Sequence, residues 1–243
     1  MLKKTIFTIA LAISLTSCES QSLLKQVNDI YKQTTANGQL TNTDIASGLK
    51  QALHKGIDTA IAQVAKPDGF LKDQAVKILL PPELQKVDKT LRSIGMSSLA
   101  DEGLKLMNRA AEDAAGKAKN IFVNAVKQMT FQDALSILMG EKNAATLYLK
   151  KTTSQQLYGE FNPVIKNSLD QVGATKVWSQ IISRYNKVPL VTKVNPDLAD
   201  YVTNKAMDGV FFKVEQEELA IRKDPVNRTT DLLKKVFAKQ DGK

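Results

Sequence analysis

Apolar residues recur at steps of three and four along most of this 243-residue chain, a spacing that places them on one face of an α-helix. The clearest stretch follows Thr43, a candidate N-cap, and contains Ile45, Leu49, Ala52, Leu53, Gly56, Ile57, Ala60, Ile61 and Val64. Only residues 187–194 alternate as a strand would, around Pro189, and one such segment cannot build a sheet. We therefore predict an all-α fold.

Proline, glycine and capping residues divide this pattern into roughly eight helices. Helices are predicted over residues 43–64, 83–94, 98–129, 130–140, 143–169 and 174–185, and two more begin near Asn195-Pro196 and Asp224-Pro225. Thr130 and Asp133 have the spacing of a capping box, Gly140 is expected to be a left-handed C-cap, and Pro163 is expected to restart or kink its helix. The chain shows neither a fixed-period repeat nor a linker after residue 42. We predict a single-domain multi-helix bundle over residues 43–243.

The N-terminus has the organisation of an export signal. Lys3 and Lys4 precede an apolar stretch from Thr5 to Leu15, which is too short to span a bilayer. The run Leu15-Thr16-Ser17-Cys18 resembles the lipobox of bacterial lipoproteins, and Cys18 is the only cysteine in the chain. Residues 1–17 are therefore predicted to be a lipoprotein signal peptide. Residues 18–42 would be a lipidated Cys18 followed by a flexible tether, because they are rich in Gln, Ser, Thr and Asn.

This resemblance implies a location in the bacterial cell envelope. Several acyl chains on Cys18 would hold the chain on a membrane, since each buried methylene contributes about 0.8 kcal/mol. The next residue, Glu19, is not the aspartate that tends to retain lipoproteins in the inner membrane of enteric bacteria. We therefore expect an outer-membrane protein facing the periplasm in preference to an inner-membrane one. The alternatives are an uncleaved anchor or a buried thiol.

The charge of the chain favours an anionic surface over nucleic acid as a partner. Removal of residues 1–17 takes away Lys3 and Lys4, so the formal charge falls from +9 to +7. The remaining lysines are dispersed among acids and are not interleaved with aromatic residues, which argues against a nucleic-acid interface. Attraction to an anionic membrane or an acidic polysaccharide is the better use of this charge.

The supply of reactive side chains limits the possible chemistry. One histidine, His54, and one cysteine exclude zinc modules rich in cysteine, disulfide frameworks and histidine-rich metal sites. No phosphate-binding glycine loop, nucleophile elbow or zinc-protease helix motif is present. We predict no cofactor, no metal site and no catalytic residue, and we interpret His54 as a residue on the flank of a helix.

Two groups of charged residues are nevertheless candidates for a site. Arg109 and Glu112 lie one helical turn apart. They would be either an anion clamp with a general base or a structural ion pair on the side of a helix.

The second group occupies the end of the helix that begins near residue 195. Glu217 and Glu218 stand where a further core residue is due, and Arg222 and Arg228 are possible partners. They would form either a polar cluster that joins the last two helices or a solvated charged turn. A loss of stability of only a few tenths of a kcal/mol in Arg222→Ala would fit only the second alternative.

Several phrases of the chain together resemble a bacterial family of unknown function, DUF4197. These phrases are Asp68-Gly69-Phe70-Leu71, Leu80-Pro81, Met107-Asn108-Arg109-Ala110-Ala111-Glu112, Met129-Thr130-Phe131-Gln132-Asp133-Ala134, Ile137-Leu138, Ala145-Thr146-Leu147-Tyr148-Leu149, and Glu217 to Pro225. Where the family has Gly-Gly, this chain has Met139-Gly140. The resemblance implies an exported or lipid-anchored protein of Gram-negative bacteria and assigns no catalytic or ligand-binding residue.

Three functions remain open at this point. The first is a non-enzymatic, lipid-anchored protein that binds a partner or scaffolds the envelope. The second is a carrier of an apolar ligand, which would need an apolar void of several hundred Å³ between the alanine-rich helices. The third is an enzyme, which would need Arg109, Glu112, Glu217 and Glu218 to converge in one open cleft.

Overall fold

The computed structural model describes residues 41–80, 85, 92, 93, 95, 97–228 and 230–238. All regular structure in these residues is helical, which confirms the predicted all-α class. Residues 42–243 form one compact unit. Cys18 and the predicted signal peptide and tether, together with most of the predicted helix over residues 83–94, lie outside the described residues.

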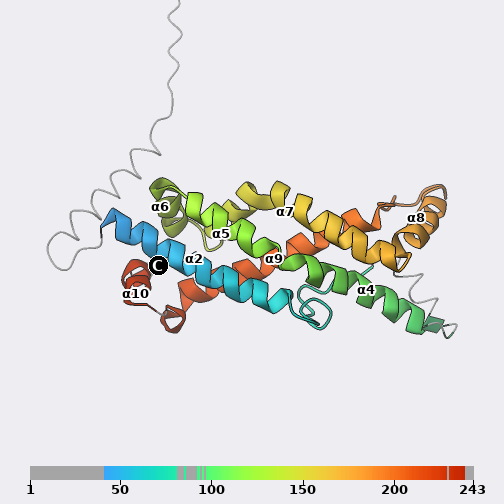
Figure 1. Ribbon diagram of the computed structural model, residues 1–243, viewed down its shortest axis with the longest axis horizontal. Helices are drawn as coiled ribbons and strands as arrows, with labels where there is room; N and C mark the ends of the chain where they lie inside the picture. Colours follow the sequence, from blue (N-terminus) through green and yellow to red (C-terminus); the bar gives the residue numbers. More distant parts are fainter. Residues whose placement is uncertain are drawn as a thin grey trace, which may run out of the picture. The chain divides into compact units, whose positions relative to one another are not determined.

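The helices run in the order shown in Figure 1. Their bounds are Asn42–Val64 for α2, Ser97–Ala115 for α4, Ala118–Gln128 for α5, Phe131–Met139 for α6, Ala144–Gln171 for α7, Ala174–Tyr185 for α8, Leu198–Lys223 for α9, Pro225–Asn227 for the 3-10 turn η2, and Asp231–Phe237 for α10.

Helix α9 is the centre of the packing, because it contacts α2, α4, α7, α8 and η2. Figure 1 shows it crossing the bundle obliquely, from the side of α10 to the side of α8. Its predicted apolar stripe is buried, and Val202, Ala206 and Val210 are completely enclosed. On α4 the buried positions facing this core include Ala111 and Ala114, whose small side chains allow a close approach of helices.

The stretch from residue 98 to 129 is two helices, and the prediction of one long helix was wrong. Helix α4 ends at Ala115, and α5 begins at Ala118. Gly116 stands at the break, where the Lys117 N–H donates to the Ala114 carbonyl in a tight turn. Glycine weakens a helix interior by about 1 kcal/mol, so this point of the chain turns easily and allows α5 to pack on both α2 and α7.

Gly140 has a different role from the one predicted. Its φ of −80° and ψ of −170° are extended, so it is not a left-handed C-cap. A Cβ atom at this position would lie 2.7 Å from the Ser136 carbonyl oxygen. Close approach of the backbone, not a positive φ, therefore explains the glycine. The other end of α6 is as predicted, since Thr130 and Asp133 form a reciprocal capping box.

Three other helix boundaries differ from the predicted ones. Pro163 lies inside α7, which continues to Gln171 without a restart. Helix α9 begins two residues after Pro196, with Asp197 as the N-cap. Asp224-Pro225 opens only the short turn η2, and α10 begins later, behind Thr230.

The segment between α2 and α4 is held against the helices by a buried aromatic ring. Phe70 is completely buried, and its ring lies against the backbone of Gly209 in α9. A Cβ atom at Gly209 would lie 2.5 Å from Cε1 of Phe70. The absence of a side chain at Gly209 is thus what lets this segment reach α9.

We predict that Gly209→Ala lowers the free energy of unfolding by about 1–3 kcal/mol, because the enclosed Phe70 ring cannot move aside without cost. Gly159→Ala in α7 is the matched control. No atom lies within 4 Å of a Cβ at Gly159, so alanine there should stabilise the helix by about 0.5–1 kcal/mol. Urea unfolding followed by circular dichroism measures both effects, and equal effects of the two substitutions would contradict this account of Phe70.

Candidate functional site

Glu112 holds the turn that follows α2. Its carboxylate accepts the backbone N–H groups of Asp68, Phe70 and Leu71 at 3.1, 3.0 and 3.1 Å. Successive N–H groups of a turn form a concave site for an anion, and here the anion is a side chain of the same protein. Glu112 is 4% exposed, so these hydrogen bonds replace the water that the carboxylate has lost.

Arg109 covers the same carboxylate from the outside. Its guanidinium donates to Glu112 at 2.6 Å and to Asp68 at 2.6 Å. Lys72 also pairs with Asp68, and its hydrogen bond, followed by the charge of Arg109, lowers the pKa of Asp68. Asp68 adopts a positive φ of 65°, a conformation that aspartate tolerates better than most residues. Arg109 therefore bridges two acids of the protein, and the side of its guanidinium that faces the turn is occupied by them.

Two further contacts fasten the rest of this segment. The side chain of Asn108 accepts the Ile78 N–H at 2.8 Å and donates to the Ile78 carbonyl at 2.9 Å. Lys213 of α9, which is almost buried, pairs with Asp73 at 2.6 Å and lowers its pKa mainly through that hydrogen bond. We call Asn108, Arg109 and Glu112 of α4, together with their partner Asp68, the α4 clamp, because these side chains hold residues 68–78 against α4.

Glu218 performs a similar task at the start of α7. Its carboxylate accepts the N–H groups of Ala145 and Thr146 at 3.0 and 2.8 Å and the Thr146 hydroxyl at 2.9 Å. Asn143, where this helix was predicted to begin, makes no side-chain cap. A buried carboxylate from α9 thus caps α7, where the helix dipole also favours a negative charge.

Arg222 completes this second group. It donates to Glu218 through Nε at 3.0 Å and Nη2 at 2.9 Å. Its Nη2 also reaches the Ile137 carbonyl at 2.7 Å, near the C-terminal end of α6. Glu218 and Arg222, which we call the α9 pair, therefore join the end of α6 and the start of α7 to one turn of α9.

Arg228 and Glu217 lie beside the α9 pair but bind other groups. Arg228 is 1% exposed, donates to the carbonyls of Ile221 and Arg222 at 3.1 and 2.9 Å, and lies over the Phe237 ring of α10. Glu217 accepts from Gln63 of α2 at 2.9 Å. Arg228 thus caps the end of α9 and links it to α10, whereas Glu217 contacts α2.

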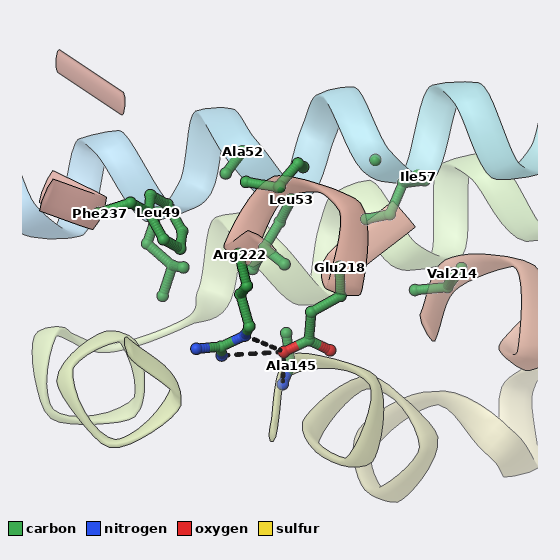
Figure 2. Close-up of a pocket in the computed structure, with 11 residues that line it drawn as sticks. Leu49, Ala52, Leu53, Ile57, Ala145, Val214, Glu218, Arg222 and Phe237 are labelled. Atoms are coloured by element: carbon green, nitrogen blue, oxygen red, sulfur yellow. Dashed lines mark hydrogen bonds and ion pairs between the residues drawn. The ribbon is translucent and has the colours of Figure 1, made fainter. Parts of the chain in front are cut away.

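A small cavity adjoins the α9 pair. Figure 2 shows Glu218 and Arg222 reaching toward Ala145 from α9, with apolar side chains of α2 on the other side. The lining includes Leu49, Leu53 and Ile57. The enclosed volume is about 20 Å³, which is room for about one water molecule. A larger surface groove of about 450 Å³ lies elsewhere, between residues 75–80 and α9.

The two groups do not meet. The α4 clamp binds residues beyond the C-terminal end of α2, whereas the α9 pair adjoins Leu49 and Leu53 in its first half. From Ile57, the last α2 residue that lines this cavity, to Val64 the helix rises about 10 Å. Glu112 and Glu218 therefore belong to separate clusters, while Glu217 bonds Gln63 near the C-terminal end of α2. His54 belongs to neither cluster and is partly exposed on α2.

Neither cluster offers a ready metal site. Among the described residues, no three His, Cys, Asp or Glu side chains gather closely enough to hold a metal ion. No helix within the same residues has both the length and the apolarity to cross a membrane.

Comparison with known proteins identifies the family. The sequence profile described as "Protein of unknown function (DUF4197)" matches residues 39–238. The chain belongs to the DUF4197 family. No curated protein and no solved structure matches it. The phrases through which it resembles DUF4197 proteins include Met107 to Glu112 and Glu217 to Pro225, which contain most of the α4 clamp and the α9 pair.

Some members of these clusters were not predicted from the sequence. Asp68, Asn108 and Lys213 were not selected as site residues, although Asn108 is adjacent to Arg109 and completely buried. Lys213 has one detectable signal, because it falls between Val210 and Val214 on the buried side of α9. Asp68-Gly69 was noted in the sequence as part of a phrase that resembles DUF4197, and the partner of this turn in α4 is far away in sequence.

We expect Glu112→Gln to lower the free energy of unfolding by about 3 kcal/mol, because the amide group turns a donor toward N–H donors and leaves Arg109 with Asp68 as its remaining acidic partner. Glu102→Gln in the same helix is the control. Glu102 is about half exposed and contacts only Lys105 at 3.7 Å, so its loss should stay within about 0.5 kcal/mol. Chemical denaturation compares the two variants, and similar midpoints would show that Glu112 does not hold the turn.

The adjacent glutamates of α9 provide a second matched pair. Glu218→Gln should cost about 3 kcal/mol, because it leaves Arg222 without its buried counter-charge and α7 without its cap. Glu217→Gln should cost less than about 1 kcal/mol, since glutamine can still bond Gln63. Thermal unfolding of both proteins tests this difference, and the interpretation of Glu218 as a cap fails if Glu217→Gln is the more damaging change.

Proposed function

We propose that this DUF4197 protein is a lipid-anchored helical protein of the cell envelope that binds a partner or scaffolds the envelope without catalysing a reaction. The observation that supports this proposal most is the use of the buried acids. The carboxylates of Glu112 and Glu218 are each occupied by backbone N–H groups and one guanidinium. A general base needs a lone pair that faces the substrate. The lone pairs of these two carboxylates accept hydrogen bonds from the protein itself.

The enzyme hypothesis loses its structural premise for the same reason. It required the α4 clamp and the acids of α9 to share one open cleft, whereas the carboxylates of Glu112 and Glu218 are buried and bound to different backbone segments. The alternative of an apolar-ligand carrier also has little support. Ligand pockets hold about 300–1,000 Å³, whereas the apolar cavity between α2 and the α9 pair holds about 20 Å³. A second hollow beside Arg222 holds about 300 Å³, but charged Glu141, Lys142 and Lys223 line it.

The larger groove is a surface feature of mixed polarity. Apolar Leu79 and Phe212 line it together with charged Lys205 and Asp208. Leu79 and Phe212 are 52% and 40% exposed, so an apolar ligand in this groove would remain in contact with water. A binding protein that presents side chains on its surface agrees better with this arrangement than a carrier does.

The anchor is proposed from the sequence of the N-terminus. A basic start, a short apolar stretch and a lipobox-like Cys18 occur in the order that export and acylation require. Lipid attachment would place a bundle with a formal charge of +7 beside a membrane, where its cations are attracted to anionic groups.

We expect intact cells to incorporate a labelled fatty acid into the wild-type chain and not into Cys18→Ala. The substituted protein should also retain residues 1–17 and therefore migrate as the larger precursor. Gel mobility and fatty-acid labelling measure these two effects. Unchanged labelling of Cys18→Ala would refute the anchor.

Crosslinking in the same cells then examines the partner. A crosslinked species present in the wild type and lost in Cys18→Ala would support a scaffold that works only at the membrane. If the wild type forms no crosslinked species at all, the carrier becomes the better hypothesis.

A further inference from the structure

All the charged side chains of residues 171–196 are positive. This segment comprises α8 and the loop that follows it, and it contains no Asp or Glu. Its cations are Lys176, Arg184, Lys187 and Lys193, and all of them are exposed. Residues 114–132 and 142–159 also lack acids, but each of these stretches carries three lysines. Residues 171–196 are thus the longest acid-free stretch of the chain and the one with the most cations.

Exposed apolar residues gather in the same segment. Val172, Val177, Val188 and Leu190 are each more than half exposed, and they are half of the large apolar residues found exposed in the described part of the chain. Leu190 has the full exposure of an isolated residue, 106%. Single exposed apolar residues are ordinary, but a group of them among cations is typical of a surface that enters a membrane interface.

The loop that carries Leu190 has a rigid base. The Asn186 side chain donates to the Val194 carbonyl at 2.7 Å and accepts the Val194 N–H at 2.9 Å. Next to it, the buried indole of Trp178 donates to the Asn195 carbonyl at 3.1 Å and stacks on Tyr201 of α9. These bonds close the loop at both ends, so that residues 187–193 project from a fixed point.

Leu190 is held in an unfavourable conformation. Its φ of 64° lies in the left-handed region, which costs a residue with a Cβ atom about 1–2 kcal/mol. Burial of a leucine normally offsets such a cost, but Leu190 is buried by nothing in the described fold. A strained and fully exposed leucine at the tip of a closed loop therefore indicates a role outside the fold.

The acids that border this segment are already engaged. Asp170 pairs with Lys166 and accepts from Thr175. Asp197 caps α9, and Asp200 accepts the Tyr158 hydroxyl at 2.6 Å. These bonds direct the carboxylates toward Lys166, Thr175, the α9 N-terminus and Tyr158, and no ion pair of the described residues joins them to the four cations.

We propose that residues 171–196 dock on an anionic lipid bilayer, with Lys187 and Lys193 among the head groups and Leu190 inserted at the acyl boundary. A lipid surface suits this combination better than a protein does, because protein interfaces are depleted of lysine. The segment lies at the end of the bundle remote from α10 and the start of α2 (Figure 1). This contact goes beyond the proposed Cys18 anchor and does not depend on it.

The experiment places an environment-sensitive dye on the loop of the full chain. Two proteins carry Cys18→Ala together with either Leu190→Cys or Leu147→Cys, each labelled at the new thiol with a nitrobenzoxadiazole dye. Leu147 is a matched control, because it is an exposed leucine of α7 outside the segment. The N-terminus is the same in both, so a difference between the dyes reports the loop. We expect a blue shift and a rise in emission only at position 190, and only when phosphatidylcholine vesicles contain phosphatidylglycerol.

Charge and insertion are then separated with further variants. In the dye-labelled protein, Lys187→Gln with Lys193→Gln should weaken the vesicle response by about fivefold for each lysine, whereas Lys117→Gln with Lys127→Gln in and beside α5 should leave it unchanged. In the unlabelled Cys18→Ala chain, which keeps residues 1–17, Leu190→Asn should weaken co-sedimentation with anionic vesicles while its Tm stays equal or rises, because asparagine tolerates the left-handed conformation.

Several results would overturn the proposal. The first is an equal dye response at positions 190 and 147, and the second is an equal response to vesicles with and without phosphatidylglycerol. The third is binding to a soluble acidic polysaccharide that displaces the vesicles and is unaffected by Leu190→Asn, which would make the segment a charge-only surface. A Tm of Leu190→Asn well below that of the parent chain would show instead that Leu190 serves the fold.

Discussion

The arrangement of the helices depends on the interactions of the Glu218 carboxylate. An ionised group without water costs several kcal/mol unless hydrogen bonds and a counter-charge replace its hydration. Glu218 obtains both from different elements, since two N–H groups of α7 and the guanidinium of Arg222 converge on it. Because Arg222 in turn holds a carbonyl of α6, displacement of α6 or α7 would leave this buried ion pair without the backbone hydrogen bonds that replace its hydration.

The same principle operates at the other end of α2, with a loop in place of a helix start. A turn exposes several N–H groups with no partner of their own, and burial of such a turn is unfavourable unless an acceptor meets them. Glu112 is that acceptor, and Arg109 neutralises its charge. Both clusters therefore couple a buried acid to orphan backbone donors and to an arginine on the same helix. This pairing explains why residues that look like catalytic candidates in sequence belong to the framework of the fold.

Helices and caps could be predicted from this sequence because their signals are local. The spacing of apolar residues indicates α2 and α9, and Thr130 with Asp133 lies within one turn. Glu218 could be selected because it interrupts an apolar stripe, but its partners in α7 could not, since every residue carries a backbone N–H. The break at Gly116 was missed because the apolar pattern continues across it, and only contacts with α2 and α7 favour two helices over one.

The backbone conformations in most of this bundle are the ones that their residue types prefer. The exceptions differ in whether contacts within the fold explain them. The positive φ of Asp68 has an explanation inside the protein, because it turns the chain toward Glu112 and its side chain meets Arg109. The positive φ of Leu190 has none, because its side chain contacts solvent alone. Sequences that fold well keep few such conflicts. Leu190 is strained and exposed, and the cations near it in sequence have no acids among them. Contact with a surface outside the molecule is the simplest explanation of this arrangement.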